Sequence, residues 1–150
     1  MSKVSIYLNF MGQTEEAFRF YKEVFGTDFI PGENGADMMY MKDIPADPSM
    51  PELSEEDANK VMHVALPILG GTQLMGTDMI ESMGHELKVG NNININLQPD
   101  TRAETDTLFS ALSDGASEVM NLEEMFWGDY FGSLQDKFGI HWMFNCEEKA

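Results

Sequence analysis

The stretch GNNININL, from Gly90 to Leu97, decides the fold. Polar and apolar side chains alternate strictly from Asn92 to Leu97, which predicts a β-strand with one buried face and one open face. Asparagine is a poor strand former, so a face lined with carboxamides indicates a use beyond simple solvation. A ligand site is one such use, because a carboxamide both donates and accepts hydrogen bonds without carrying charge.

The same alternation occurs near the start of the chain, at residues 4–10. Each alternating stretch is followed by an amphipathic segment, at 14–25 and at 101–112, which predicts a helix in both places. Thr14 is the predicted N-cap of the first helix, and Thr101 with Glu104 forms a predicted capping box at the second. Short strands are predicted at 27–30 and 36–41, and a hairpin is predicted through Gly70 and Gly71.

The chain therefore reads β-α-β-β-β twice, which predicts an α+β fold of two modules in one domain, 1–150. Module one covers about 1–80, a link about 81–89, and module two about 90–148. The segment 43–58, rich in proline and acidic residues, is a predicted loop with a short helix capped by Ser54. Each module has one helix for one sheet face, so we expect the two uncovered faces to curve around a shared cleft.

This arrangement assigns every alternating residue to a face. Val4, Ile6, Leu8 and Phe10 should pack under the first helix, and Ile93, Ile95 and Leu97 under the second. The alternative is a solvated sheet face with no ligand. The candidate ligand-binding residues are Ser5, Tyr7, Asn9, His63, Asn92, Asn94, Asn96, Trp127, Tyr130, His141 and Met143.

His63 is the candidate catalytic residue, because an imidazole exchanges protons near neutral pH. The alternative is a histidine that is hydrogen-bonded for structural reasons. His141 shares a predicted face with Met143 and Asn145, and His85 lies in the link. The aromatic side chains of Trp127, Tyr130 and Phe131 either wall a pocket or belong to the ordinary core.

Composition limits the partners. The chain carries 26 acidic and 9 basic residues, a formal charge of −17, which opposes binding to nucleic acid or to anionic membranes. An acidic surface also serves solubility alone. No apolar run approaches the ~18 residues of a membrane span, and residues 1–10 lack a signal-peptide layout. We therefore expect a cytoplasmic protein, in which the single Cys146 needs no disulfide partner.

Several motifs together resemble a known family: YLNF, FYKEVFG, MHVAL, LMGTD, MFWGDYFGSLQDKFGIHWM and NCE. With the paired β-α-β-β-β units, they resemble the vicinal oxygen chelate superfamily, which includes glyoxalase I, bleomycin-resistance proteins and extradiol dioxygenases. More narrowly, they resemble its PhnB-like branch, which often carries the label 3-demethylubiquinone 3-methyltransferase. The resemblance implies a glyoxalase-like fold and, because superfamily units commonly pair, a homodimer.

In metal-using members of the superfamily, four strand positions supply the ligands, and these correspond by register to Ser5, His63, Asn92 and Met143. Only His63 is a good ligand for a divalent ion, so we expect no metal cofactor. A metal site completed from the loop, by Glu52 or Asp57, is the weaker alternative. The methyltransferase label lacks support in the residues, because no glycine-rich loop typical of doubly wound cofactor binders is present.

Two functions follow. In the first, a metal-free cleft binds a small organic molecule, uncharged or cationic, without chemistry. In the second, the chain is a lyase or isomerase that uses His63 as base or metal ligand, while Asn92 or Tyr7 polarises the substrate.

Overall fold

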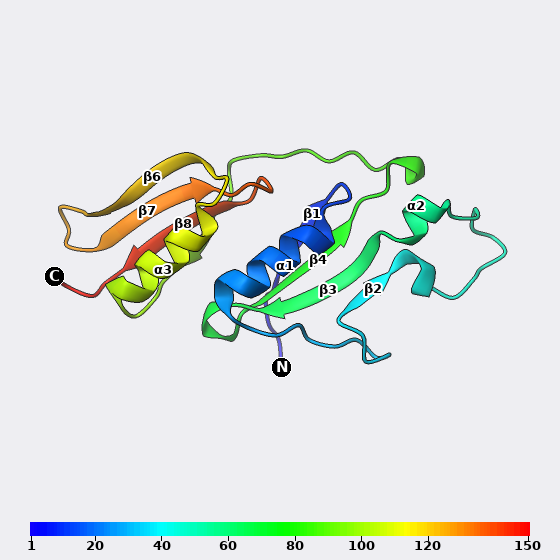
Figure 1. Cartoon of the computed structure of the whole chain (residues 1–150), viewed down its shortest axis with the longest axis horizontal. Coiled ribbons are helices and arrows are strands. Elements are labelled where there is room, and N and C mark those ends of the chain that lie inside the picture. The colour runs from blue at the N-terminus through cyan, green and yellow to red at the C-terminus, as the bar shows by residue number, and fades with distance from the viewer. The chain divides into compact units, whose positions relative to one another are not determined.

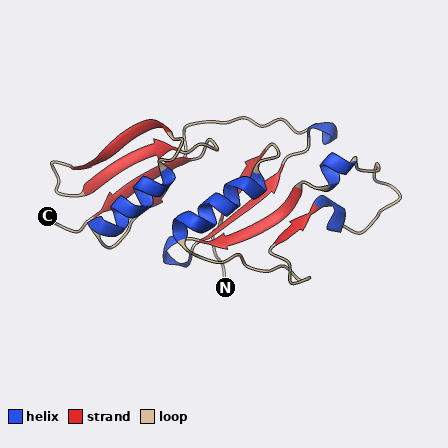
Figure 2. Cartoon of the chain, viewed as in Figure 1, coloured by secondary structure: helices blue, strands red, loops and turns tan.

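The computed structural model describes residues 1–150 and divides the chain into two compact units, Met1–Leu87 and Lys88–Ala150 (Figure 1). Each unit contains a four-stranded mixed sheet and one long helix (Figure 2). The predicted α+β fold of two β-α-β-β-β modules is therefore confirmed. The predicted link at 81–89 contains a short 3₁₀ turn, η3 (Glu81–Met83), and the division between the units falls after Leu87.

The first unit begins with strand β1 (Ile6–Phe10) and helix α1 (Thr14–Phe25). β2 (Met38–Tyr40), the 3₁₀ turn η1 (Met41–Asp43) and the short helix α2 (Glu55–Ala58) follow. The hairpin of β3 (Val61–Pro67) and β4 (Gln73–Asp78) turns through η2 (Leu69–Gly71), as the glycine pair predicts. The sheet order is β1-β4-β3-β2, with β1 parallel to β4 and the other pairs antiparallel.

The second unit repeats this topology. It contains β5 (Ile95–Leu97), α3 (Arg102–Leu112), β6 (Ser117–Glu124), β7 (Tyr130–Gln135) and β8 (His141–Cys146). The sheet order is β5-β8-β7-β6, again with only the first pair parallel. Each position in the second sheet therefore has a counterpart in the first.

One helix covers one face of each sheet. In the first unit α1 packs on β3 and β4, and the buried row includes Leu8, Phe10, Val64, Leu66 and Leu74. In the second unit α3 packs on β8 over Trp142 and Phe144. The alternate residues of each strand therefore lie on a face without a helix, as the pattern predicts.

The predicted burial of two residues is wrong. Val4 is 92% exposed and Ile93 is 77% exposed, whereas Leu8, Ile95 and Leu97 are buried as expected. The reason is strand length, since β1 starts at Ile6 and β5 only at Ile95. Residues ahead of the first paired position have no ladder to hold them over the sheet.

The helix caps agree with the sequence at two of three positions. Thr101 Oγ1 accepts a hydrogen bond from the Glu104 amide, without the reciprocal Glu104 side-chain bond of the predicted capping box, and Ser54 Oγ accepts one from the Asp57 amide. Thr14, however, is the first residue of α1 rather than its N-cap. The predicted strand at 27–30 is also absent, although the Ile30 amide does bond to the Ala65 carbonyl.

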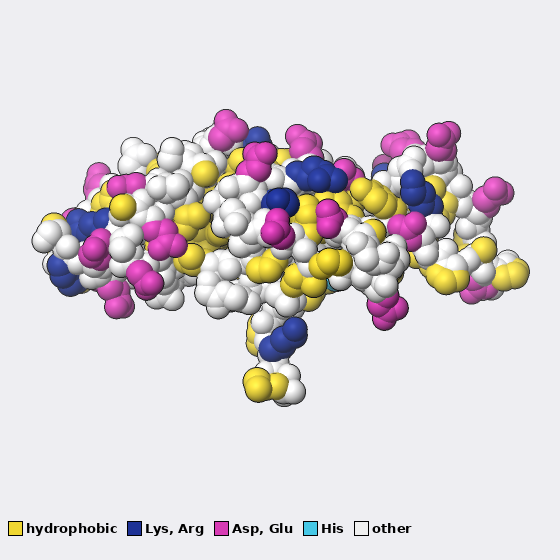
Figure 3. Space-filling model, turned by 60° about the horizontal axis from the view of Figure 1, so that its bottom comes forward, with side chains coloured by type: hydrophobic (Ala, Val, Ile, Leu, Met, Phe, Trp, Pro, Cys, Tyr) yellow, Lys and Arg dark blue, Asp and Glu magenta, His cyan; other side chains and the backbone are white.

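The surface reflects the acidic composition. Acidic side chains are distributed over the face drawn in Figure 3 rather than gathered in one patch. No helix of the chain has the length and apolar character needed to cross a bilayer.

Candidate functional site

The open face of the first sheet brings together side chains from three strands. Tyr7 on β1, Met75 on β4 and Ala65 on β3 are register partners and form one row across the sheet. Asn9 pairs with Thr77 in the next row. All five alternate with residues buried under α1, so they lie on the face that the helix leaves uncovered.

His63 and Tyr7 make a direct contact on this face. The Tyr7 hydroxyl and His63 Nδ1 lie 3.2 Å apart, and the two ring centroids are 5.9 Å apart. The contact reaches from β1 to β3 across the intervening strand β4. The sequence predicts this face for both residues but does not predict the hydrogen bond between them, because they are 56 positions apart.

The protonation state of the Tyr7 phenol determines which hydrogen bonds this pair can make. Burial of its ring raises the pKa of Tyr7 above the ordinary value, so the phenol is neutral at physiological pH and keeps its proton. When the hydroxyl donates to Nδ1, the neutral imidazole carries its own proton on Nε2. Tyr7 is 48% exposed, so a molecule on the open face can reach the pair.

Two further polar side chains flank this pair. Ser5 Oγ donates to Met75 Sδ at 3.8 Å, which occupies its proton within the protein. The exposed carboxamide of Asn9 has no side-chain hydrogen bond and is free to bind a ligand. The face therefore offers neutral donors and acceptors beside the thioether of Met75.

The second sheet has an open face of its own. Asn96, Met143 and Ser133 are register partners across β5, β8 and β7, and His141 pairs with Gln135. These residues alternate with buried Ile95, Trp142 and Leu134. The predicted faces of Asn96, His141 and Met143 are therefore as expected.

The structure places four other predicted residues differently. Asn92 and Asn94 precede β5 and are exposed, with Asn92 in a bend, so strand alternation does not orient them. The Tyr130 hydroxyl donates to Asp106 Oδ1 on α3 at 2.6 Å, so Tyr130 lies on the helix side of its sheet. Trp127 lies in the turn between β6 and β7, stacked edge-on against Phe126.

The residues in the metal-ligand positions of the superfamily do not suit a metal. The Ser5 hydroxyl donates a hydrogen bond to Met75 Sδ, and Asn92 is a neutral carboxamide in an exposed bend outside the strand. Met143 offers only a thioether, which leaves His63 as the single good donor. No three His, Cys, Asp or Glu side chains of the chain are grouped as ligands for a metal ion.

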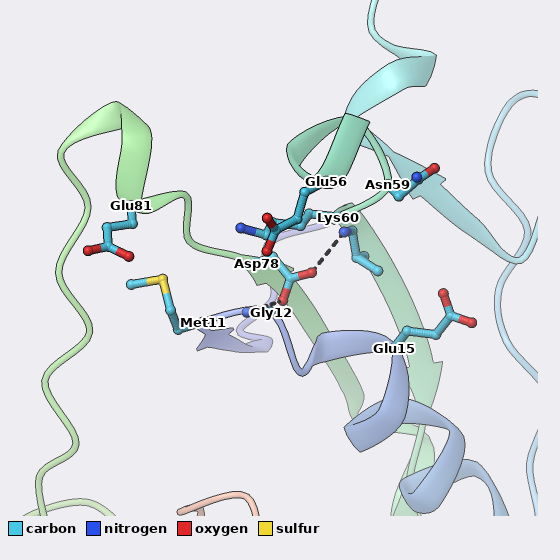
Figure 4. Close-up of a pocket in the computed structure, with 9 residues that line it drawn as sticks. Met11, Gly12, Glu15, Glu56, Asn59, Lys60, Asp78 and Glu81 are labelled. Atoms are coloured by element: carbon cyan, nitrogen blue, oxygen red, sulfur yellow. Dashed lines mark hydrogen bonds between the residues drawn. The ribbon is translucent and has the colours of Figure 1, made fainter. Parts of the chain in front are cut away.

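A hollow of about 550 Å³ at the start of α1 is drawn in Figure 4. Acidic side chains from several elements line it, among them Asp78, with Lys60 beside them. Asp78 accepts hydrogen bonds from the amides of Gly12 and Thr14, from the Thr14 hydroxyl and from the Val61 amide, at 2.7–3.1 Å. Its carboxylate is therefore fully used in capping α1 and in holding the start of β3.

Comparison with solved structures defines the class of fold. A glyoxalase/bleomycin resistance protein/dioxygenase domain from Frankia superposes with a TM-score of 0.62 at 12% identity, covering 99% of this chain and 93% of that one. The fosfomycin resistance protein FosX from Listeria monocytogenes superposes with a TM-score of 0.59 at 10% identity, covering 96% and 89%. The chain thus has a glyoxalase-like fold.

The family is shown by sequence. Residues 2–144 match the family described as 3-demethylubiquinone-9 3-methyltransferase, and the chain belongs to this PhnB-like family. Protein PA1353 from Pseudomonas aeruginosa is 31% identical, with 98% of both chains covered and a TM-score of 0.77. An uncharacterized protein of Mycobacterium tuberculosis, Rv0887c, is 35% identical over 89 residues, which are 55% of this chain. The matched part spans about half the length of that relative, 51%.

Proposed function

We propose that this chain binds a small organic molecule, uncharged or cationic, on the open face of its first sheet, without a metal ion. The observation that carries the proposal is the Tyr7–His63 hydrogen bond at 3.2 Å on the face that α1 leaves uncovered. Asn9 adds a free carboxamide on the same strand as Tyr7. Asn96, His141 and Met143 are the proposed ligand contacts of the second sheet.

The character of the face supports binding of a neutral or cationic molecule. A protonated phenol, an imidazole and a carboxamide fix the orientation of a ligand through directed hydrogen bonds. No lysine or arginine belongs to the strand residues of this face, so it carries no permanent positive charge to attract an anion. The thioether of Met75 adapts to varied apolar shapes.

The methyl transfer named in the family description is not part of this proposal. The connection from β1 to α1 carries one glycine, Gly12, where doubly wound cofactor binders carry three in the pattern G-x-G-x-x-G. Both sheets are mixed rather than parallel.

A second function is favoured by the same contact. In the other tautomer, in which Nδ1–H donates to the Tyr7 oxygen, Nε2 is unprotonated and points in a fixed direction, as a general base requires, and the Tyr7 hydroxyl can donate to a substrate. In this alternative the chain is a lyase or isomerase, with His63 as base and Tyr7 polarising the substrate. A homodimer, implied by the superfamily, is a further proposal, which light scattering during size-exclusion chromatography tests against a monomer of 16.9 kDa.

The test is a ligand-observed NMR screen of small neutral and cationic fragments, followed by titration of each hit into variants. Tyr7→Phe removes one hydroxyl from the open face and should weaken binding about threefold to tenfold. Tyr130→Phe is the matched control, because it removes a hydroxyl bonded to Asp106 on the helix side.

Equal affinity in Tyr7→Phe and Tyr130→Phe would contradict the proposed site. A His63→Ala variant that keeps ligand affinity but loses turnover of a bound compound would favour the lyase or isomerase.

A further inference from the structure

The segment between η1 and α2 encloses a hollow of its own in the first unit. This hollow has a volume of about 710 Å³, within the range of small-molecule sites. It is lined by the residues of 41–53 other than Asp43 and Ser49, together with Ala58 and Met83. None of these residues belongs to the open face of the first sheet, so the hollow is a separate feature.

Hydrogen bonds hold the walls of this hollow in place. The Met41 amide donates a hydrogen bond to the Lys60 carbonyl, which ties the start of the segment to the second residue after α2. Ser82 Oγ donates to Asp57 Oδ2 at 2.7 Å, which ties η3 to α2 and fixes the position of Met83. The 44–53 segment is therefore anchored at both ends, although it forms no helix or strand.

The lining is apolar and poor in backbone donors. Pro45, Pro48 and Pro51 have no backbone N–H. Met41, Met50 and Met83 supply flexible, polarisable side chains that adapt to varied shapes. Met50 is 56% exposed, and Figure 3 shows apolar side chains uncovered at the right-hand end, where this segment lies in Figure 1.

The charged side chains of the lining that remain available to a ligand are negative. Asp47 and Glu52 both line it. Hydrogen bonds from the backbone and hydroxyl of Ser49 lower the pKa of Asp47, which keeps its carboxylate charged. The only lysine of the lining, Lys42, donates to Asn59 Oδ1 at 3.1 Å and lies 5.5 Å from the centre of the Tyr40 ring.

We infer that this hollow binds an amphiphilic organic cation, whose apolar body lies against the methionine and proline side chains while its charge faces Asp47 and Glu52. The net charge of −17 raises the local concentration of such cations and opposes apolar anions such as fatty acids. The site differs from the open sheet face in its residues and in requiring a positive charge on its ligand.

The experiment uses two ions of nearly equal shape and opposite charge, tetraphenylphosphonium and tetraphenylborate, each titrated into the full chain by isothermal calorimetry. We expect saturable binding of the phosphonium and at least about tenfold weaker binding of the borate. The double variant Asp47→Asn/Glu52→Gln should weaken phosphonium binding about tenfold. Glu33→Gln/Asp37→Asn, which removes the same charge from exposed positions outside the lining, should change it less than about twofold.

A second pair of variants tests the position of the site. Met50→Lys places a positive charge in the lining and should abolish phosphonium binding, whereas Val119→Lys adds the same charge to an exposed position of β6 and should not. Equal binding of the two ions, equal losses in the two acidic double variants, or absence of phosphonium binding would each overturn the inference.

Discussion

The two units share one topology but use their buried aspartates differently. Asp78, at the end of β4, accepts hydrogen bonds from both sides of the turn before α1 and from the first residue of β3. Asp136, after β7, accepts from the amides of Phe138 and Ile140 and from the Trp142 indole. The first carboxylate fixes a helix to its sheet, and the second fixes a turn between two strands.

This difference shows which residue accepts the hydrogen bonds of the backbone amides at the start of each helix. Helix α3 is capped by Thr101, the residue immediately before it. Helix α1 has no cap from its neighbour Gln13, and the carboxylate of Asp78, 64 residues away, takes the Thr14 amide instead. The start of α1 therefore depends on tertiary structure, while the start of α3 is local.

The largest expected effect is that of Asp78→Ala. The variant leaves three buried or partly buried amides and one hydroxyl without their acceptor, so it should lower the free energy of unfolding by about 3–5 kcal/mol. Urea denaturation measures the change, and hydrogen exchange should show the loss of protection in α1 and β3. Asp136→Ala should instead expose amides of β7 and β8, and the same exchange pattern in both variants would contradict the distinction.

The second effect concerns the contact between α1 and its sheet. A Cβ on Gly76 would lie 2.4 Å from Cε1 of the buried Phe18 ring, so Gly76→Ala should destabilise the chain by about 1–3 kcal/mol through overpacking. Chemical denaturation of the double variant Gly76→Ala/Phe18→Leu should show a cost below the sum of the two single costs. Gly132→Ala is the control in the second sheet, and it should be additive with Phe18→Leu.

A smaller effect on stability distinguishes the N-terminus of α3 from that of α1. Thr101→Ala removes the cap of α3 and should cost about 1 kcal/mol in thermal or chemical denaturation. Gln13→Ala, at the corresponding position of α1, should change stability by less than about 0.5 kcal/mol because its side chain makes no cap bond. Comparable losses at both positions would show that α1 is also capped locally.

The smallest expected effect is a change in the pKa of Tyr130. The pKa of Tyr130 is raised mainly by its hydrogen bond to Asp106, whereas the pKa of Tyr7 is raised by burial. Asp106→Asn should therefore lower the pKa of Tyr130 toward 10.0 and leave that of Tyr7 in place, as followed by ¹³C NMR of labelled tyrosine.

The two raised tyrosine pKa values determine whether the stability of the fold rises or falls with pH. Both phenols keep their protons to higher pH in the folded chain than in the unfolded chain. Their contribution to stability is therefore complete below pH 10.0 and is lost as the pH rises through the folded pKa values. Denaturation midpoints that rise between pH 9 and 11 would contradict this assignment.

Local periodicity predicted much of the fold, because the burial of alternate residues is visible over five to eight positions. It gave the faces of Leu8, Ile95 and Leu97 and both long helices. It could not give the starting residues of β1 and β5, which depend on how far β4 and β8 extend alongside. Val4 and Ile93 were misplaced for that reason.

Local periodicity does not predict contacts between residues that are far apart in the sequence. The bond of Asp78 to Thr14 spans 64 positions, and no local pattern marks it. The sequence groups Tyr130 with the ligand-facing aromatic residues, because only the register of β7 with β8 shows that Tyr130 pairs with Cys146 on the helix side. His63 and Tyr7 were both candidates, but their contact required the strand order.

The most direct test of the proposed site is the imidazole spectrum of His63 in ¹⁵N-labelled protein during titration with hits from the fragment screen. His85, whose Nδ1 accepts a hydrogen bond from the Ile80 amide and which is not a proposed ligand contact, serves as the internal comparison. The proposal predicts saturable chemical-shift changes of the His63 ring nitrogens. In the Tyr7→Phe variant the same changes should require a higher ligand concentration, because the affinity is lower. Hits that bind saturably while the His63 ring nitrogens stay unshifted would contradict it.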